Sequence, residues 1–138
     1  MAGDGFRSGV IAAAVSNGTL QDGSQKVVLP DHKLTIIPRE AEVEADYLAS
    51  FLNSDVTQLI VRSYALATGI STHILDRVAT PRFSRKAARH CDLAELDRRA
   101  RLGLIDETGL SQISVLSAQV IGLSMEQAEI VRKELARL

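Results

Sequence analysis

The sequence predicts an α+β fold, with a short antiparallel sheet or hairpin at the N-terminus followed by about five helices. Near the N-terminus, apolar residues occur in short runs that are separated by turn-forming residues. From about residue 41, apolar residues recur every three or four positions, which is the period of an amphipathic helix. With 46% hydrophobic residues and three prolines in 138, the chain has the composition of one small domain or of a fragment of a larger one.

Three short strands are expected in a β-rich segment over residues 1–40. Val10–Val15 is an apolar run between Gly and Ser residues, as in a buried strand. Residues 16–24 contain Asn-Gly and Asp-Gly, which favour the tip of a hairpin. Residues 26–29 and 34–37 follow as strands, separated by a break at Pro30. These strands predict a small antiparallel sheet.

A helical hairpin and an irregular loop are expected over residues 41–83. The first helix is predicted by apolar residues at helical spacing: Val43, Tyr47, Leu48, Phe51 and Leu52. Either Asn53 or Ser54 is suited to cap the next helix, which should end at Gly69. Two helices joined by so short a turn must fold back on each other or bend sharply. Residues 70–83 are expected to be extended or irregular, since Pro81 disfavours helix before it.

C-terminal helices are expected over residues 84–138, which makes the chain one compact fragment. Asp92 and Glu95 form a capping-box pattern for a helix that runs to about Leu102. A second helix over 113–121 should close at Gly122. Ser124 and Gln127 form another capping-box pattern. The last helix should bury the stripe Ala128, Val131, Leu135 and Leu138.

The residues show no catalytic or metal-binding constellation. Cys91 is the single cysteine, so an internal disulfide is excluded and a reducing, cytoplasmic setting is expected. The three histidines lie too far apart for a helical metal pair, and Gly3-Asp4-Gly5 is a poor nucleotide-binding loop. The longest apolar run has six residues, far below the ~18 of a membrane span. We therefore expect no enzyme in this chain alone, no cofactor in it and no membrane partner.

Charge is distributed unevenly along the chain. Residues 62–101 carry nine basic and four acidic side chains, net +5, although the whole chain has a net charge of −1. Such a basic segment is compatible with a surface that binds a polyanion, but the charge pattern alone favours a solvated helix face.

Several segments in order resemble a known family. They are Pro30–Pro38, Ala45–Ser54 with its Leu-Asn-Ser end, Val61–Ala65, Thr68–Leu75 with Ile-Ser-Thr-His-Ile-Leu, and Ala79–Phe83. Leu93–Leu96, Gly122–Gln127 and Ile130–Arg132 continue the pattern. This order resembles the C-terminal region, with target recognition and a helical tail, of adenine-specific N6 DNA methyltransferases of restriction–modification systems. The resemblance covers roughly residues 26–138, and residues 103–112 depart from it.

The resemblance implies a non-catalytic DNA-recognition module, because the family's catalytic motifs are missing. There is no Pro-Pro pair for the motif that holds a flipped adenine, and no well-placed glycine loop for S-adenosylmethionine. That cofactor is expected in a separate methyltransferase domain or subunit, within restriction–modification or phage defence. Double-stranded DNA is the second implied partner, with these contact candidates: Arg62, Thr72, His73, Arg82, Arg85 and Lys86.

The alternative hypothesis is a protein-interaction module. The last two expected helices, Ile113–Ile121 and Met125–Leu138, have apolar faces that we do not expect so small a chain to bury fully. They would then dock a methyltransferase domain or a second copy of the chain.

Overall fold

A computed structural model describes residues 10–15, 37–64 and 78–138 of the chain. Within these ranges the protein is all-α, with no strand or sheet. The described helices are α2 (Glu42–Asn53), α3 (Asp55–Tyr64), α5 (Ala88–Arg101), α6 (Glu107–Val120) and α7 (Met125–Arg137). The predicted α+β class is therefore wrong for the described part. The expected turn at 16–24, the strand at 26–29 and all but Ile37 of the strand at 34–37 lie outside it.

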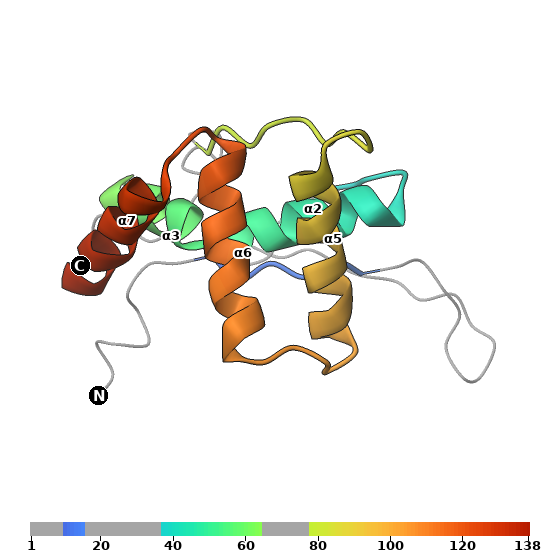
Figure 1. The fold of residues 1–138 in the computed structure, drawn as a ribbon. Coiled ribbons are helices and arrows are strands. Elements are labelled where there is room, and N and C mark those ends of the chain that lie inside the picture. The colour runs from blue at the N-terminus through green and yellow to red at the C-terminus, as the bar shows by residue number, and fades with distance from the viewer. Residues whose placement is uncertain (1–9, 16–36, 65–77) are drawn as a thin grey trace.

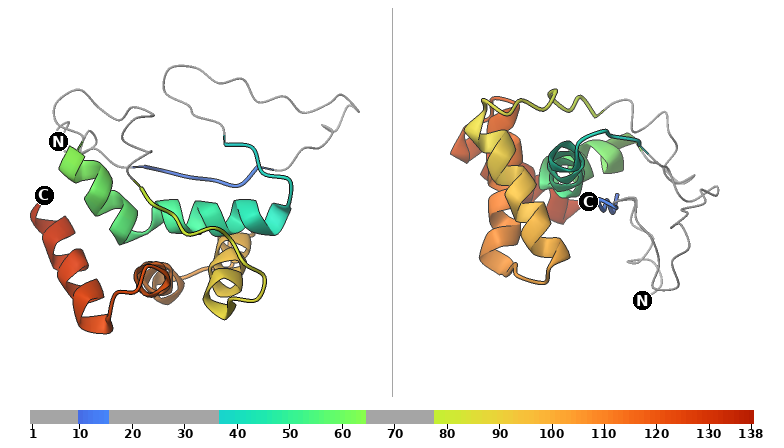
Figure 2. Two further views of the ribbon diagram at one scale, coloured as in Figure 1. Left: turned by 90° about the horizontal axis from the view of Figure 1, so that it is seen from above. Right: turned by 90° about the vertical axis from the view of Figure 1, so that its right-hand side faces the viewer.

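Helix α2 lies at the centre of the molecule (Figures 1 and 2). On one side it is crossed by α5 and α6, which lie next to each other. On its other side runs the segment of residues 10–15. Helix α3 follows α2 after a bend, and α7 packs against α3 and α6. None of the described helices has the length and apolar character needed to cross a membrane.

The predicted strand at 10–15 has no partner strand among the described residues. Exposure alternates along it: Val10, Ala12 and Ala14 are half-buried, whereas Ile11 is 98% exposed. Its backbone hydrogen bonds go to the side chains of Asn53 and Gln58. A short apolar run predicts that alternate side chains pack on an apolar surface. It does not predict which groups form hydrogen bonds with the backbone. The inference of a sheet therefore failed here.

Two apolar clusters share α2. The first comprises Tyr47, Leu93, Ala94, Leu96 and Ile113, and it joins α2 to α5 and α6. The second comprises Phe51, Leu52, Val61 and Val78, and it joins α2 to α3 and to the start of the following loop. Val10 and Ala12 pack on this second cluster, and Val120 contacts both. The predicted stripe of the first helix is thus confirmed as core.

Ser54 is the residue that caps α3. Its hydroxyl donates to the carbonyl of Phe51 at 2.6 Å and accepts from the N–H of Thr57 at 3.4 Å. Asn53 is instead the last residue of α2, and its side chain is exposed. Of the two capping residues that the sequence left open, the structure selects Ser54. The predicted helix stop at Gly69 lies outside the described residues.

The start of α5 differs from the prediction. The helix begins at Ala88, four residues before the expected cap at Asp92, and Asp92 is exposed inside it. Its N-cap, Ala87, has no capping side chain. A turn closed by the N–H of Ala87 and the carbonyl of Ser84 leads into the helix, and no capping box marks its start, so the sequence pattern misplaced it. The expected end near Leu102 is confirmed, since Leu102 is the C-cap.

Helices α6 and α7 follow their local capping signals. Helix α6 begins at Glu107, six residues before the predicted start, because Asp106 accepts the N–H of Gly109 at 2.9 Å. Gly122 has φ +88° after α6, a conformation that favours glycine. The capping box of Ser124 and Gln127 is confirmed. The predicted stripe of α7 is only half-buried at Ala128, Val131 and Leu135, and Leu138 is 46% exposed.

Candidate nucleic-acid interface

Four exposed cations follow one another before and at the start of α5. We call residues 82–89 the basic loop; its cations are Arg82, Arg85, Lys86 and Arg89. None of the four forms an ion pair with a carboxylate of the described residues. The basic loop therefore presents positive charge that these residues do not neutralise.

The remaining arginines of α5 have structural partners. Arg98 and Arg99 both contact Glu95, at 2.6 and 3.3 Å. Arg101 binds Asp46 of α2 through two hydrogen bonds of 2.9 Å. Near α5, the arginines toward the end of the helix are thus paired, whereas the cations at its start have no carboxylate partner among the described residues.

Three side chains hold the backbone of the basic loop and of Pro81 just before it. The Tyr47 hydroxyl donates to the carbonyl of Pro81 at 2.7 Å. The Nδ1 atom of His90 accepts the N–H of Ser84 at 3.0 Å. The Cys91 thiol donates to the carbonyl of Arg85 at 3.4 Å. Because these anchors belong to α2 and α5, the loop is fixed to the helical core.

An aromatic cluster supports these anchors. The rings of Tyr47 and His90 stack with their centroids 4.8 Å apart, and Phe83 packs on Tyr47 at 5.3 Å. Burial lowers the pKa of His90, which keeps Nδ1 free to accept a hydrogen bond at neutral pH. Burial also raises the pKa of Tyr47 to about 12, so its hydroxyl stays a donor. At neutral pH, both groups therefore keep the protonation states that these hydrogen bonds need.

The N-terminus of α5 adds to the positive potential. Its first turn contains no acidic residue, and Ala87 offers no side chain to its N–H groups. The positive end of the helix dipole then lies beside Arg85, Lys86 and Arg89 instead of beside carboxylates. Like charges placed together in this way disfavour folding slightly, and a bound anion would relieve that repulsion.

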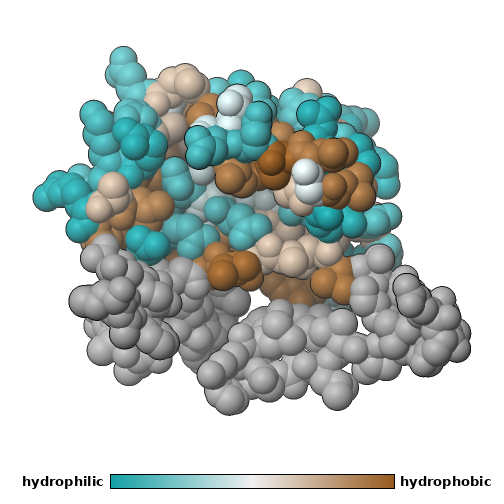
Figure 3. Space-filling view, turned by 90° about the horizontal axis from the view of Figure 1, so that it is seen from below, coloured by the Kyte–Doolittle hydropathy of each residue, from teal (hydrophilic) through white to brown (hydrophobic). Residues whose placement is uncertain are grey.

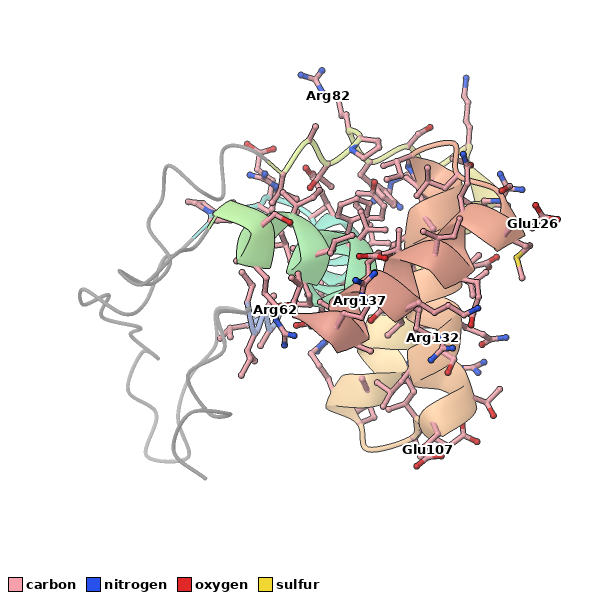
Figure 4. All side chains as sticks on the ribbon, turned by 90° about the vertical axis from the view of Figure 1, so that its left-hand side faces the viewer. Arg62, Arg82, Glu107, Glu126, Arg132 and Arg137 are labelled. Atoms are coloured by element: carbon pink, nitrogen blue, oxygen red, sulfur yellow. The ribbon has the colours of Figure 1, made fainter. Side chains whose placement is uncertain are left out.

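The structure brings some of the predicted contact residues together and separates others. Arg82, Arg85 and Lys86 share the basic loop. Arg62 lies on α3, and Figure 4 shows it apart from Arg82 and pointing in another direction. Thr72 and His73 lie outside the described residues. Arg62 is therefore not part of the basic loop.

Sequence reasoning missed Arg89. It lies in the first turn of α5, four residues after Arg85. Because the helix was expected to begin only at Asp92, there was no reason from the sequence to group Arg89 with Arg85. The anchoring roles of Tyr47 and His90 were also missed, because 43 residues separate these two positions in the sequence. A local pattern carries no signal for such a contact.

The adjacent residues His90, Cys91 and Asp92 have different surroundings in the structure. His90 and Cys91 bind the backbone of the basic loop, and Asp92 is exposed. Among the described residues, no group of three His, Cys, Asp or Glu side chains is arranged to hold a metal ion.

Comparison with known proteins gave no match to a protein-family model, to a curated protein or to a solved structure. The site itself defines a small helical module that presents a fixed, basic loop.

Proposed function

We propose that this chain is a non-catalytic DNA-recognition module whose basic loop contacts the phosphates of duplex DNA. One observation carries the proposal: four exposed cations without ion-pair partners in the described residues lie on a loop that three side chains anchor to the core. Phosphate contacts need positive charge at fixed positions, and they supply most of the affinity for DNA. A loop that is already ordered loses little conformational entropy on binding.

We extend the proposal to the partner on the strength of the sequence resemblance. The module would serve an adenine-N6 DNA methyltransferase, with S-adenosylmethionine bound by a separate catalytic domain or subunit. The basic loop overlaps Ala79–Phe83, the segment in which the resemblance includes a Pro-Arg-Phe sequence. Arg82 belongs to both, so the resemblance and the unpaired charge point to the same part of the molecule.

The test is a salt titration of binding to mixed-sequence duplex DNA, measured by fluorescence anisotropy. If the four cations each neutralise one phosphate, log K should fall with log[salt] with a slope of about −3.6. Affinity would then drop on the order of 100-fold between 50 and 200 mM salt. The variant with Arg82, Arg85, Lys86 and Arg89 all changed to Ala should lose both the binding and its salt dependence.

A charge-matched control separates the basic loop from net charge. Arg98, Arg99, Arg132 and Arg137 are four exposed arginines that already pair with glutamates of their own helices. Changing these four to Ala removes the same total charge and should leave most of the DNA affinity. Equal losses in the two quadruple variants would refute a specific role for the basic loop. Absence of binding by the folded wild-type chain at low salt would refute DNA binding by this chain.

Exposed apolar side chains support a second candidate function, docking to another protein. Large examples lie on α6, on α7 and in the turn before α6: Leu102, Leu104, Leu110, Met125 and Ile130, which are 55–68% exposed. Figure 3 shows apolar side chains gathered among polar ones on the underside of the molecule. Helix α7 itself has no fully buried residue. Such a surface fits a methyltransferase domain or a second copy of the chain.

A further inference from the structure

Two side-chain amides bind the backbone of residues 10–12. The Gln58 side chain accepts the N–H of Val10 at 2.7 Å and donates to the carbonyl of Val10 at 2.8 Å. The Asn53 side chain accepts the N–H of Ala12 and donates to its carbonyl, both at 2.8 Å. Each amide thus pairs with both polar groups of one residue, as a strand residue does across an antiparallel sheet. Asn53 and Gln58 replace a neighbouring strand.

The amides are presented by the bend between α2 and α3. Asn53 is the last residue of α2, and Gln58 lies in the first turns of α3. Gln58 also donates to the carbonyl of Leu52 at 2.9 Å, which orients its amide group whether or not residue 10 is bound. The Ser54 cap fixes the bend between the two helices. The two amides of Asn53 and Gln58 are therefore held in place by the ends of the two helices rather than by the bound segment.

An apolar floor lies beneath the bound backbone. Val10 and Ala12 pack on the cluster of Phe51, Leu52, Val61 and Val78. The alternate side chains point away from the helices, since Ile11 is 98% exposed and Val15 is 56% exposed. Figure 2 shows this segment running along the side of α2 that is opposite to α5 and α6. The site therefore accepts small apolar side chains at every second position. The side chains between them point away from the helices and do not contribute to recognition.

We propose that Asn53 and Gln58 form a peptide-binding site for an extended polypeptide segment with small apolar residues at alternate positions. In this chain the occupant is its own segment 10–15. Both amides read backbone groups, which every non-proline residue carries, so the site recognises extended conformation rather than one sequence. The segment acts as an intramolecular ligand, and a separate peptide of the same chemistry can take its place.

The experiment uses the full chain and a synthetic peptide with the sequence of residues 8–17. An intramolecular ligand has an effective concentration in the millimolar range, so the wild-type site should exclude the peptide. The Ala12→Pro variant lacks the N–H that Asn53 accepts, which weakens the competing segment. We expect the peptide to bind this variant with a Kd at least tenfold lower than that for the wild-type chain, measured by NMR chemical-shift titration.

Two controls test whether the backbone is what the site reads. A peptide that is N-methylated at the position of Ala12 should not bind, whereas one with Thr in place of Ile11 should bind as well as the parent. Adding Asn53→Asp and Gln58→Glu to the Ala12→Pro variant removes both amide donors with little change in shape, and peptide binding should be lost. Equal binding of the methylated peptide, or of the chain with both acidic substitutions, would overturn the proposal.

Hydrogen exchange on the wild-type chain gives a test that does not depend on the proline variant. The amides of Val10 and Ala12 should be protected, and those of Ile11 and Ala13 should exchange faster. Asn53→Ala alone removes the acceptor of the Ala12 N–H, so it should raise the exchange rate at Ala12 at least tenfold. Far-UV circular dichroism should show unchanged helix content in every variant. Failure of the peptide to bind the folded Ala12→Pro chain, or uniform exchange over residues 10–13, would show that no such site exists.

Discussion

A buried carboxylate pair joins α2 to α5. Asp46 and Asp97 are 4% and 6% exposed, and they interact with each other. Arg101 forms two hydrogen bonds with Asp46, and its Nε atom lies 3.7 Å from Asp97. One carboxylate oxygen of Asp97 has no hydrogen-bond partner. One arginine therefore serves two buried acids, and Asp97 is the less well compensated of them.

Stability should decrease with rising pH at this pair. Burial raises the pKa of Asp97 to about 7 from a usual value of 3.8, assisted by Asp46 and opposed by Arg101. The folded state therefore holds a proton that the unfolded state has released, and this contribution is lost as the pH rises toward 7. Asp97→Asn should stabilise the protein on the order of 2 kcal/mol at pH 8 and hardly at all at pH 4.

Urea unfolding at the two pH values measures this difference. Asp92→Asn is a matched control, because Asp92 lies on the same helix and is exposed. A stabilisation by Asp97→Asn that is equal at pH 4 and pH 8 would contradict the assigned cause.

Helix α7 depends on its capping box more than the other helices do. It has no fully buried residue, so packing contributes less to its stability. At its N-terminus the Ser124 hydroxyl accepts the N–H of Gln127 at 3.1 Å, and the Gln127 side chain accepts the N–H of Ser124 at 2.8 Å. Within the helix, Arg132 pairs with Glu129 and Arg137 with Glu134. These exposed pairs add little.

Ser124→Ala should lower the free energy of unfolding by about 1 kcal/mol, because the N–H of Gln127 loses its acceptor at the start of the helix. Hydrogen exchange should locate the effect in α7, with faster exchange over Met125–Arg137 than over α5. Ser111→Ala in α6 is the control, since Ser111 is exposed inside a helix. An equal effect of the two substitutions would show that the capping box does not stabilise α7.

At the scale of the whole molecule, charge and apolar surface are separated. Four cations without an ion-pair partner among the described residues lie in the basic loop, whereas several exposed large apolar side chains lie on α6, on α7 and in the turn between α5 and α6. In Figure 1 the loop before α5 and the turn between α5 and α6 lie at opposite ends of α5. The surfaces of the two proposed functions therefore lie at different ends of α5.

Self-association provides the test of the apolar surface. Analytical ultracentrifugation of the wild-type chain should show a concentration-dependent dimer, which the double substitution Leu104→Glu and Ile130→Glu should convert to monomer. Both residues are more than half exposed, so the fold should tolerate the change. A wild-type chain that stays monomeric up to the highest concentration tested would exclude self-association and leave docking to a different protein.

Local signals predicted much of the helical part. The apolar period from Val43 to Leu52 identified α2 and its core face. The pair Ser124 and Gln127 fixed the start of α7, and Gly122 marked the end of α6. These succeeded because period and capping depend on residues within one or two turns of each other. The same reasoning failed at Asp92, because its capping-box pattern lies inside α5 and not at the start of that helix.

The candidate sites were predicted only in part. Sequence alone placed excess positive charge in residues 62–101 and named Arg82, Arg85 and Lys86 within it. It did not distinguish these cations from Arg98, Arg99 and Arg101, because the carboxylate of Asp46 that neutralises Arg101 lies 55 residues away. Nor did it connect Asn53 with residue 12, which is 41 positions earlier.

The sequence by itself determined the period and most of the ends of the helices, together with the amount of positive charge. Only the tertiary structure decided which cations remain unpaired, where the chain presents them, and that residues 10–15 pair with two amides instead of with a strand. The physical reason is range. Helical period and capping act over a few residues, whereas ion pairing, burial and backbone pairing depend on partners that folding brings together from distant positions.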